Sequence, residues 1–189
     1  MAVSTLDPRT ALVVIDLQKG LASRPMVHPM SVIVGNSARL AAAFRAHGLP
    51  VVLVNATGTA PGRTQTPGRG SGQFPPDFAE LMPELDAQPS DILVTKQRWG
   101  AFTGTSLHDT LQELGVTQVV VTGVATQFGV ESTARSAHEL GYHVVLAVDA
   151  MTSGEGGADA HDHTVERIFP RLGETGTTDE VLEVLAKTR

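Results

Sequence analysis

Five short apolar runs, rich in β-branched residues, recur along the chain and constrain its fold more than any other feature. They cover residues 11–15, 51–54, 92–94, 119–121 and 144–148. None of them alternates with polar residues, which is typical of strands covered on both faces. Such strands belong to parallel sheets that lie between two layers of helices. The runs therefore predict a parallel sheet at the centre of an α/β fold.

Segments with a helical spacing of apolar residues separate these runs. Three of them end at a glycine and lead almost at once into a predicted strand, at residues 31–47, 105–114 and 130–140. Helix–glycine–strand junctions are typical of a doubly wound sheet. Near the C-terminus, residues 158–172 have a helical pattern, residues 174–176 indicate a short sixth strand, and a last helix begins near Thr178. We predict one domain over residues 1–189, with a three-layer α/β/α architecture around a doubly wound, six-stranded parallel sheet.

One long connection separates the second and third runs. Residues 56–90 show no sustained periodicity, and the first half of this stretch is rich in glycine and proline. Connections of this length in compact domains are usually functional lids, partner surfaces or disordered segments. The glycine-rich residues 68–72 have neither a preceding strand nor a following Lys-Ser/Thr, so we predict a flexible loop rather than a phosphate-binding loop.

Composition excludes several functional classes. The chain contains no cysteine, which excludes disulfides, zinc–thiolate and iron–sulfur sites and a cysteine nucleophile. Its net charge is -6 and only 4% of its residues are aromatic, so we expect neither nucleic acid nor a membrane surface as a partner. No apolar run approaches the roughly 20 residues of a membrane span, and the first residues lack the pattern of a signal peptide. We expect a cytoplasmic protein.

The residues that end the predicted strands are the candidates for chemistry. The first strand ends in Asp16, the third in Lys96, and the fourth leads into a turn that reaches Gly129. Ligands of open parallel sheets bind outside the carboxyl ends of the strands, so an acid, a base and the entry to a helix would converge there. Each residue alone also has an ordinary structural interpretation. Asp16 suits a turn, Lys96 a solvated surface, and Gly129 a packing position.

Three segments carry a resemblance to a known family. Residues 11–18, 95–107 and 121–135 resemble the three signature stretches of the isochorismatase-like hydrolases, and residues 160–161 and 177–182 also fit the tail of that family. The resemblance implies a six-stranded parallel sheet, assembly as a homodimer or a higher homo-oligomer, and a cis peptide bond between Val124 and Ala125. It also implies a small-molecule substrate and no cofactor.

The chain departs from most of that family at one position. Most members have a nucleophilic cysteine where this chain has Gly129. Isochorismatases proper are similar to this chain in having Asp, Lys and a small residue at the three positions, and they cleave a vinyl ether without a covalent nucleophile. By this resemblance Asp16 is the acid, Lys96 orients it, and the space above Gly129 admits substrate or water. The backbone amides of Ala125 and Gly129 are candidate donors to a developing oxyanion.

Two other interpretations stay open. The segments around residues 123–126 and 131–135 look more like the cysteine-amidase branch than like isochorismatases proper. The chain would then be a catalytically silent homologue that binds a small ligand, or an amidase in which water replaces the thiol.

The remaining candidates concern substrate binding and metal binding. We expect Trp99, Phe102 and Gln127 to contact a small planar or carboxylated substrate, and an arginine at position 63, 69 or 98 is a candidate partner for a carboxylate. Residues 161–163, His-Asp-His, lie too close together in sequence for all three to face one ion from a helix, so we predict no metal site.

Overall fold

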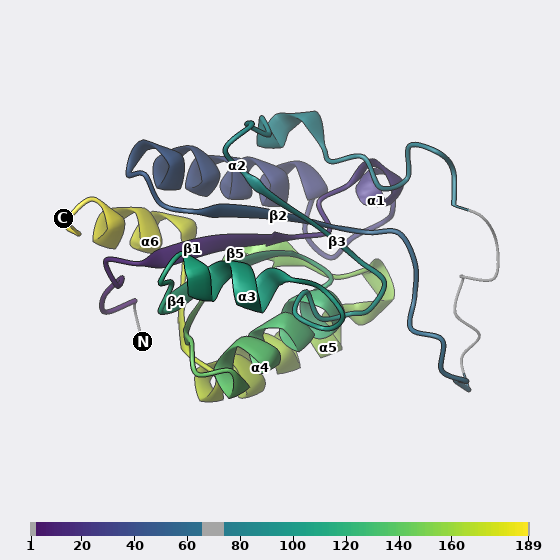
Figure 1. Cartoon of the computed structure of the whole chain (residues 1–189). Helices are drawn as coiled ribbons and strands as arrows, with labels where there is room; N and C mark the ends of the chain where they lie inside the picture. Colours follow the sequence, from purple (N-terminus) through teal and green to yellow (C-terminus); the bar gives the residue numbers. More distant parts are fainter. Residues whose placement is uncertain (1–2, 66–73, 189) are drawn as a thin grey trace.

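The computed structural model describes residues 3–65 and 74–188 and contains one six-stranded sheet (Figure 1). The strands lie in the order β3-β2-β1-β4-β5-β6, and every pairing is parallel. They are β1 (Thr10–Ile15), β2 (Val51–Ala56), β3 (Ile92–Lys96), β4 (Gln118–Val124), β5 (His143–Thr152) and β6 (Glu174–Gly176). The predicted sixth strand is therefore confirmed, as is the doubly wound order.

Helices cover both faces of the sheet, as the uninterrupted apolar strands predict (Figure 1). The helices α2 (Met30–Ala46) and α6 (Thr178–Leu185) lie on one face, together with the short α1 (Lys19–Ala22). The helices α3 (Leu107–Glu113), α4 (Glu131–Glu139) and α5 (Ala158–His163) lie on the other face. Shorter helical turns occupy Pro83–Leu85, Thr126–Val130, Glu155–Gly157, Thr164–Ile168 and Phe169–Arg171.

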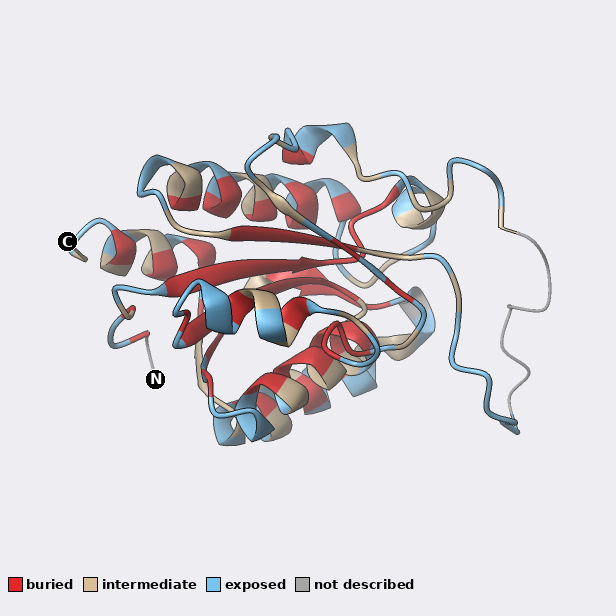
Figure 2. Cartoon of the chain, in the orientation of Figure 1, coloured by how far each residue is buried: buried red, intermediate tan, exposed pale blue. Residues whose placement is uncertain are grey.

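Two apolar clusters hold these layers together, one on each side of the sheet (Figure 2). Alternate residues of β1 contribute to opposite clusters, because successive side chains of a strand point to opposite faces. Leu12 and Val14 pack with α2, whereas Val13 and Ile15 pack toward α3 and α4. The six residues of β1 are all buried, which is the burial that their unbroken apolar pattern predicts.

The end of β5 differs from the prediction. The apolar run predicts a strand over residues 144–148, whereas the strand extends to Thr152 through a bulge. The pairing with β4 changes from Val121–Leu146 to Gly123–Met151, so β5 has extra residues at this point. The polar Asp149 lies within the bulge and interrupts the apolar run. The sequence pattern therefore does not predict the second half of the strand.

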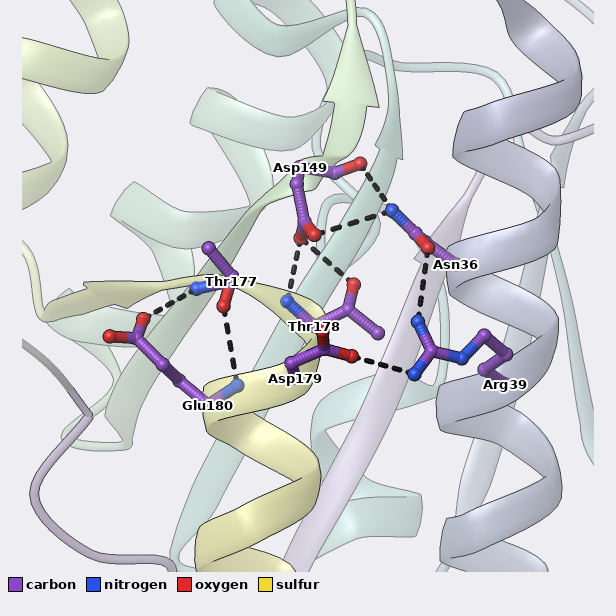
Figure 3. Close-up of polar contacts among 7 residues, drawn as sticks. All are labelled: Asn36, Arg39, Asp149, Thr177, Thr178, Asp179 and Glu180. Carbon is purple, nitrogen blue, oxygen red and sulfur yellow. Dashed lines mark hydrogen bonds and ion pairs between the residues drawn. The ribbon is translucent and has the colours of Figure 1, made fainter.

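Asp149 connects the bulge to two helices (Figure 3). Its carboxylate accepts hydrogen bonds from the backbone N–H of Thr178 at 2.7 Å and from the hydroxyl of Thr178 at 2.8 Å, at the first turn of α6. The side-chain amide of Asn36, from α2, donates to the Asp149 carbonyl at 2.9 Å. Thr177 and Glu180 complete a capping box at the same helix end. The short β6 and α6 are thereby attached to the central sheet.

The helical pattern predicted over residues 158–172 is confirmed, because α5, the π-helical turn Thr164–Ile168 and the turn Phe169–Arg171 follow one another without a break. The segment ends in a turn at Phe169–Arg171 that contains Pro170, because proline cannot donate the backbone hydrogen bond that a longer helix needs. Among the described residues, no helix is long and apolar enough to cross a bilayer.

Candidate active site

Asp16 lies immediately after β1, with its backbone held in a turn. Its φ of 52° is in the left-handed region, which aspartate tolerates better than most residues. The Asp16 N–H donates to the carbonyl of Val54 in β2 at 2.9 Å, and its own carbonyl accepts from the Gln18 N–H at 2.9 Å. The turn interpretation of Asp16 is therefore correct and is compatible with the catalytic interpretation, because the turn orients the carboxylate.

Lys96 reaches this carboxylate from two strands away. It is the last residue of β3, where it pairs in register with Ala56 at the end of β2. Its Nζ donates to Asp16 Oδ2 at 2.7 Å and to the carbonyl of Arg98 at 3.1 Å. Only 3% of the residue is exposed, which excludes the alternative interpretation of Lys96 as a solvated surface residue. The side chain crosses the carboxyl end of β2 and forms a buried ion pair with the first strand.

The two oxygens of the Asp16 carboxylate differ in their surroundings. Oδ2 accepts from Lys96, whereas Oδ1 is buried and has no hydrogen-bond partner within the described part of the chain. Burial raises the pKa of Asp16 from 3.8 to about 6, and the positive charge and hydrogen bond of Lys96 oppose this shift without cancelling it. Asp16 is therefore a carboxyl group that exchanges a proton near neutral pH and has one oxygen free to do so.

Gly129 lies against the same carboxylate. It belongs to the π-helical turn Thr126–Val130 that connects β4 to α4. A Cβ atom at this position would lie 3.4 Å from Asp16 Oδ2, 3.0 Å from Ile15 Cγ2 and 3.1 Å from the carbonyl oxygen of Val124. Position 129 therefore adjoins the acid, as the sequence predicts, and it presents no nucleophilic side chain there.

The backbone that leads to this turn has two unusual features. The Val124–Ala125 peptide bond is cis, as the family resemblance implies. One residue earlier, Gly123 has a φ of 112°, and a Cβ there would lie 2.0 Å from the carbonyl oxygen of Ile15. Only glycine allows β4 to lie this close to β1 at the point where both strands end. The Ala125 carbonyl then accepts from the Phe128 N–H at 3.0 Å and the Val130 N–H at 3.2 Å, which stabilises the turn.

The predicted substrate-binding residues separate into two groups. Trp99 is 57% exposed, and its ring centroid lies 4.8 Å from that of Phe128, a residue that is not among the predicted ones and that is 44% exposed. Gln127 is half-buried, and the hydroxyl of Ser153 donates to its side-chain oxygen. In contrast, Phe102 is buried in the core and stacks against Tyr142. Phe102 is predicted to contact the substrate, whereas in the structure it packs in the core; the neighbouring Ala101 N–H donates to the hydroxyl of Thr133 in α4.

The weaker candidates lie apart from the acid–base pair or outside the described residues. Arg63 is exposed, and Arg98 contributes its carbonyl, rather than its guanidinium, to Lys96. Arg69 and the predicted loop at 68–72 lie outside the described residues. His161 is buried and pairs through Nδ1 with the hydroxyl of Thr126 at 2.8 Å. Within residues 3–65 and 74–188, no three potential ligands gather in a group suited to a metal ion.

Sequence reasoning missed two supports of the site. Gln18 is completely buried, donates to the carbonyls of Ala56 and Phe78, and accepts from the Ala56 N–H, so it ties the turn after Asp16 to the end of β2. His161 is the second support, because it contacts Thr126 at the start of the turn that carries Gly129. Burial lowers the pKa of His161, and the nearby His28 lowers it further. A polar residue directly after an apolar strand is the signal that identifies Gln18; His161 has no comparable local signal.

Comparisons with known proteins agree with this geometry. The model of the isochorismatase domain matches residues 10–180 of the chain. The chain belongs to the isochorismatase family. It is similar to the isochorismatase family protein YwoC of Bacillus subtilis, with 40% identity over 93% of both chains. It is also similar to the ureidoacrylate amidohydrolase RutB of Variovorax paradoxus, with 30% identity over 94% of this chain and 81% of the relative.

A solved structure supports the same assignment. The isochorismatase family protein from Burkholderia thailandensis shares 41% identity with this chain and superimposes with a TM-score of 0.91, over 96% of this chain and 98% of the other. Members of the isochorismatase family are hydrolases, and the chain is accordingly a hydrolase of this family.

Proposed function

We propose that this isochorismatase-family hydrolase cleaves a small planar or carboxylated molecule by acid–base catalysis, without a covalent enzyme intermediate. Asp16 is the proton donor and Lys96 orients it, while Gly129 leaves the carboxylate without a neighbouring nucleophilic side chain. The observation that carries the proposal is the free, buried Oδ1 of a carboxyl group whose pKa is about 6.

The geometry suits the cleavage of a vinyl ether. The protonated Oδ1 gives its proton to the terminal carbon of the double bond, whose electron pair forms the new C–H bond and leaves an oxocarbenium ion. Lys96, 2.7 Å from Oδ2, stabilises the carboxylate that remains. Water adds to the oxocarbenium carbon and returns a proton to Asp16. The hemiketal hydroxyl then passes its proton to the ether oxygen as the C–O bond breaks, so isochorismate would release pyruvate and an alcohol.

Gly129 provides no nucleophilic side chain, so this scheme contains no covalent step. A nucleophilic side chain at this position would have its Cβ 3.4 Å from Asp16 Oδ2, and glycine presents no such side chain. The absence of cysteine from the whole sequence excludes a thioester intermediate elsewhere on the chain.

A second candidate function is amide hydrolysis by an activated water. The similarity to an enzyme named ureidoacrylate amidohydrolase favours it. Here Asp16 acts in the opposite sense, as a carboxylate that takes a proton from water, while the amides of Ala125 and Gly129 donate to the oxyanion. Both candidates use the same residues but require opposite protonation states of Asp16.

The pH dependence of turnover separates the two candidates. Isochorismate is supplied and pyruvate is measured, in parallel with an amide panel. If Asp16 is the acid, kcat/KM falls as the pH rises above about 6, because the group loses its proton. If Asp16 is the base, kcat/KM rises through the same pH. The variant Lys96→Met removes the charge that lowers the pKa of Asp16, so this pKa increases. The change in kcat/KM then occurs at a higher pH, whether Asp16 is the acid or the base.

The variant Asp16→Asn tests whether this residue performs the chemistry. It keeps the size of the side chain and removes the titratable proton, so we expect turnover to fall at least about a hundredfold. Asp109→Asn, an exposed aspartate on α3, is the matched control and should retain full activity. Retained turnover in Asp16→Asn would exclude both mechanisms, and failure to turn over any vinyl ether or amide would favour a silent, ligand-binding homologue.

A further inference from the structure

A shallow groove lies beside the turn Thr126–Val130 that carries Gly129. Its volume is about 480 Å³, and it runs between the connection from α1 to α2 and the connection from β5 to α5. Arg24 and Pro25 line it from the first connection, and Gln127 and Phe128 line it from the turn after β4. Phe128 directly precedes Gly129, so one wall of the groove belongs to the same turn as the candidate site.

The groove is built from fixed backbone on both sides. The Val27 N–H donates to the Ser153 carbonyl at 2.9 Å, and Met26 and Gly154 form an isolated antiparallel bridge. Gly154 and Gly156 also line the groove, and a Cβ atom at either position would meet nothing within 4 Å. The two connections are thus held together, while small residues leave the space between them open.

Arg24 is the charged side chain among the described residues that line this groove. Its guanidinium has no ion pair or hydrogen bond within the described part of the chain, although the protein has a net charge of -6. A planar guanidinium with free donors binds a carboxylate through two parallel hydrogen bonds. A single arginine suits one carboxylate better than a phosphate, which usually needs further donors or a second cation.

We propose that this groove is a subsite for the carboxylate-bearing arm of the substrate, with Arg24 as its specificity-determining residue. A flat body would lie against Phe128, which also contacts Trp99, and its carboxylate would pair with Arg24 at the far end. The proposal rests on the proposed function, since it defines the substrate class for the same site.

Equilibrium binding of benzoate and benzamide tests the subsite without any need for turnover. The two probes share a flat ring and differ in charge. Trp99 is the only tryptophan of the chain and contacts Phe128, so its fluorescence reports on binding. We expect benzoate to bind more tightly than benzamide, and Arg24→Gln to weaken benzoate binding about three- to tenfold while leaving benzamide binding unchanged.

Two further variants make the result specific to the groove. Arg9→Gln, at an exposed arginine before the amino end of β1, is the control and should leave the affinity for benzoate unchanged. Gly156→Leu fills the groove without meeting a neighbouring atom at its Cβ, so it should weaken both probes. Phenyl phosphate provides the comparison with a different anion and should bind no more tightly than benzoate.

Equal binding of benzoate and benzamide, equal effects of Arg24→Gln and Arg9→Gln, or a clear preference for phenyl phosphate would overturn the proposal. These outcomes are independent of the proposed function, because benzoate undergoes no reaction. Conversely, the variant Asp16→Asn should still bind benzoate, and adding Arg24→Gln to it should still weaken that binding. This holds even if the proposed chemistry proves wrong.

Discussion

Asp16 owes its chemical properties to burial more than to its partner. Desolvation is the largest influence on its pKa, and Lys96 acts against it. An exposed aspartate with the same lysine would ionise near or below its usual pKa and could not donate a proton near neutral pH. The free Oδ1 adds the second requirement, since a carboxyl group whose oxygens are both engaged would have to break a hydrogen bond before reacting.

Gly129→Ala tests how tightly the site is packed around this carboxylate. The added methyl would lie 3.0 Å from Ile15 Cγ2 and 3.1 Å from the Val124 carbonyl oxygen, both closer than a comfortable contact. We expect the free energy of unfolding to decrease by about 1 kcal/mol. Urea denaturation measures this change.

Gly35→Ala is the matched control for that substitution. Gly35 is an exposed residue within α2, and a Cβ there would meet nothing within 4 Å. Alanine should therefore stabilise the protein by about 0.5–1 kcal/mol, through helix propensity alone. An equal gain in stability from both substitutions would contradict the close packing at Gly129.

At the scale of elements, short segments depend on polar contacts rather than on their own length. The helix α6 has eight residues and β6 has three, too few for either to be stable alone. Asp149 in the bulge of β5 compensates by binding the first turn of α6 (Figure 3). The bulge, which interrupts the apolar pattern of β5, therefore provides the contact that attaches α6 to the sheet.

Asp149→Ala should reduce the free energy of unfolding by about 1–2 kcal/mol, because it removes a helix cap and leaves the Thr178 N–H without its acceptor. Urea denaturation gives the value. Asp179→Ala is the control on the same helix: it removes the exposed ion pair with Arg39 and an exposed acidic group of the first turn, and it should cost less than Asp149→Ala (Figure 3). Similar losses from both variants would contradict a special role for Asp149.

At the scale of the whole molecule, the sheet order brings the functional groups together. β1 lies beside β4, and β2 alone separates it from β3, so the ends of three strands converge although Asp16 and Lys96 lie 80 positions apart in sequence. This is the arrangement that parallel topology produces at the carboxyl edge of a sheet. β3 is an edge strand of that sheet, and its residue Leu93 is 68% exposed.

We predict that the protein forms a homodimer or a larger homo-oligomer and that Leu93 lies in the contact. An exposed edge strand with a large apolar side chain is a surface that proteins usually cover. Analytical ultracentrifugation should give a mass at least twice the 19.9 kDa of one chain, and Leu93→Lys should shift it toward the monomer. Leu140→Lys, at a residue 42% exposed after α4, is the control. A monomeric wild-type protein would refute this prediction.

The sequence determined the architecture and which charged side chains meet at the carboxyl edge of the sheet. Unbroken apolar strands can be buried only between two helical layers, and parallel strands place Asp16, Lys96 and the turn at Gly129 on one edge. The tertiary structure decided the properties of that edge. The raised pKa of Asp16, the burial of Lys96, the inward position of Phe102 and the capping role of Asp149 all depend on atoms from distant segments. The desolvation and the packing of a residue depend on all the atoms that surround it in space. Most of those atoms come from distant parts of the chain, so a local sequence pattern does not reveal them.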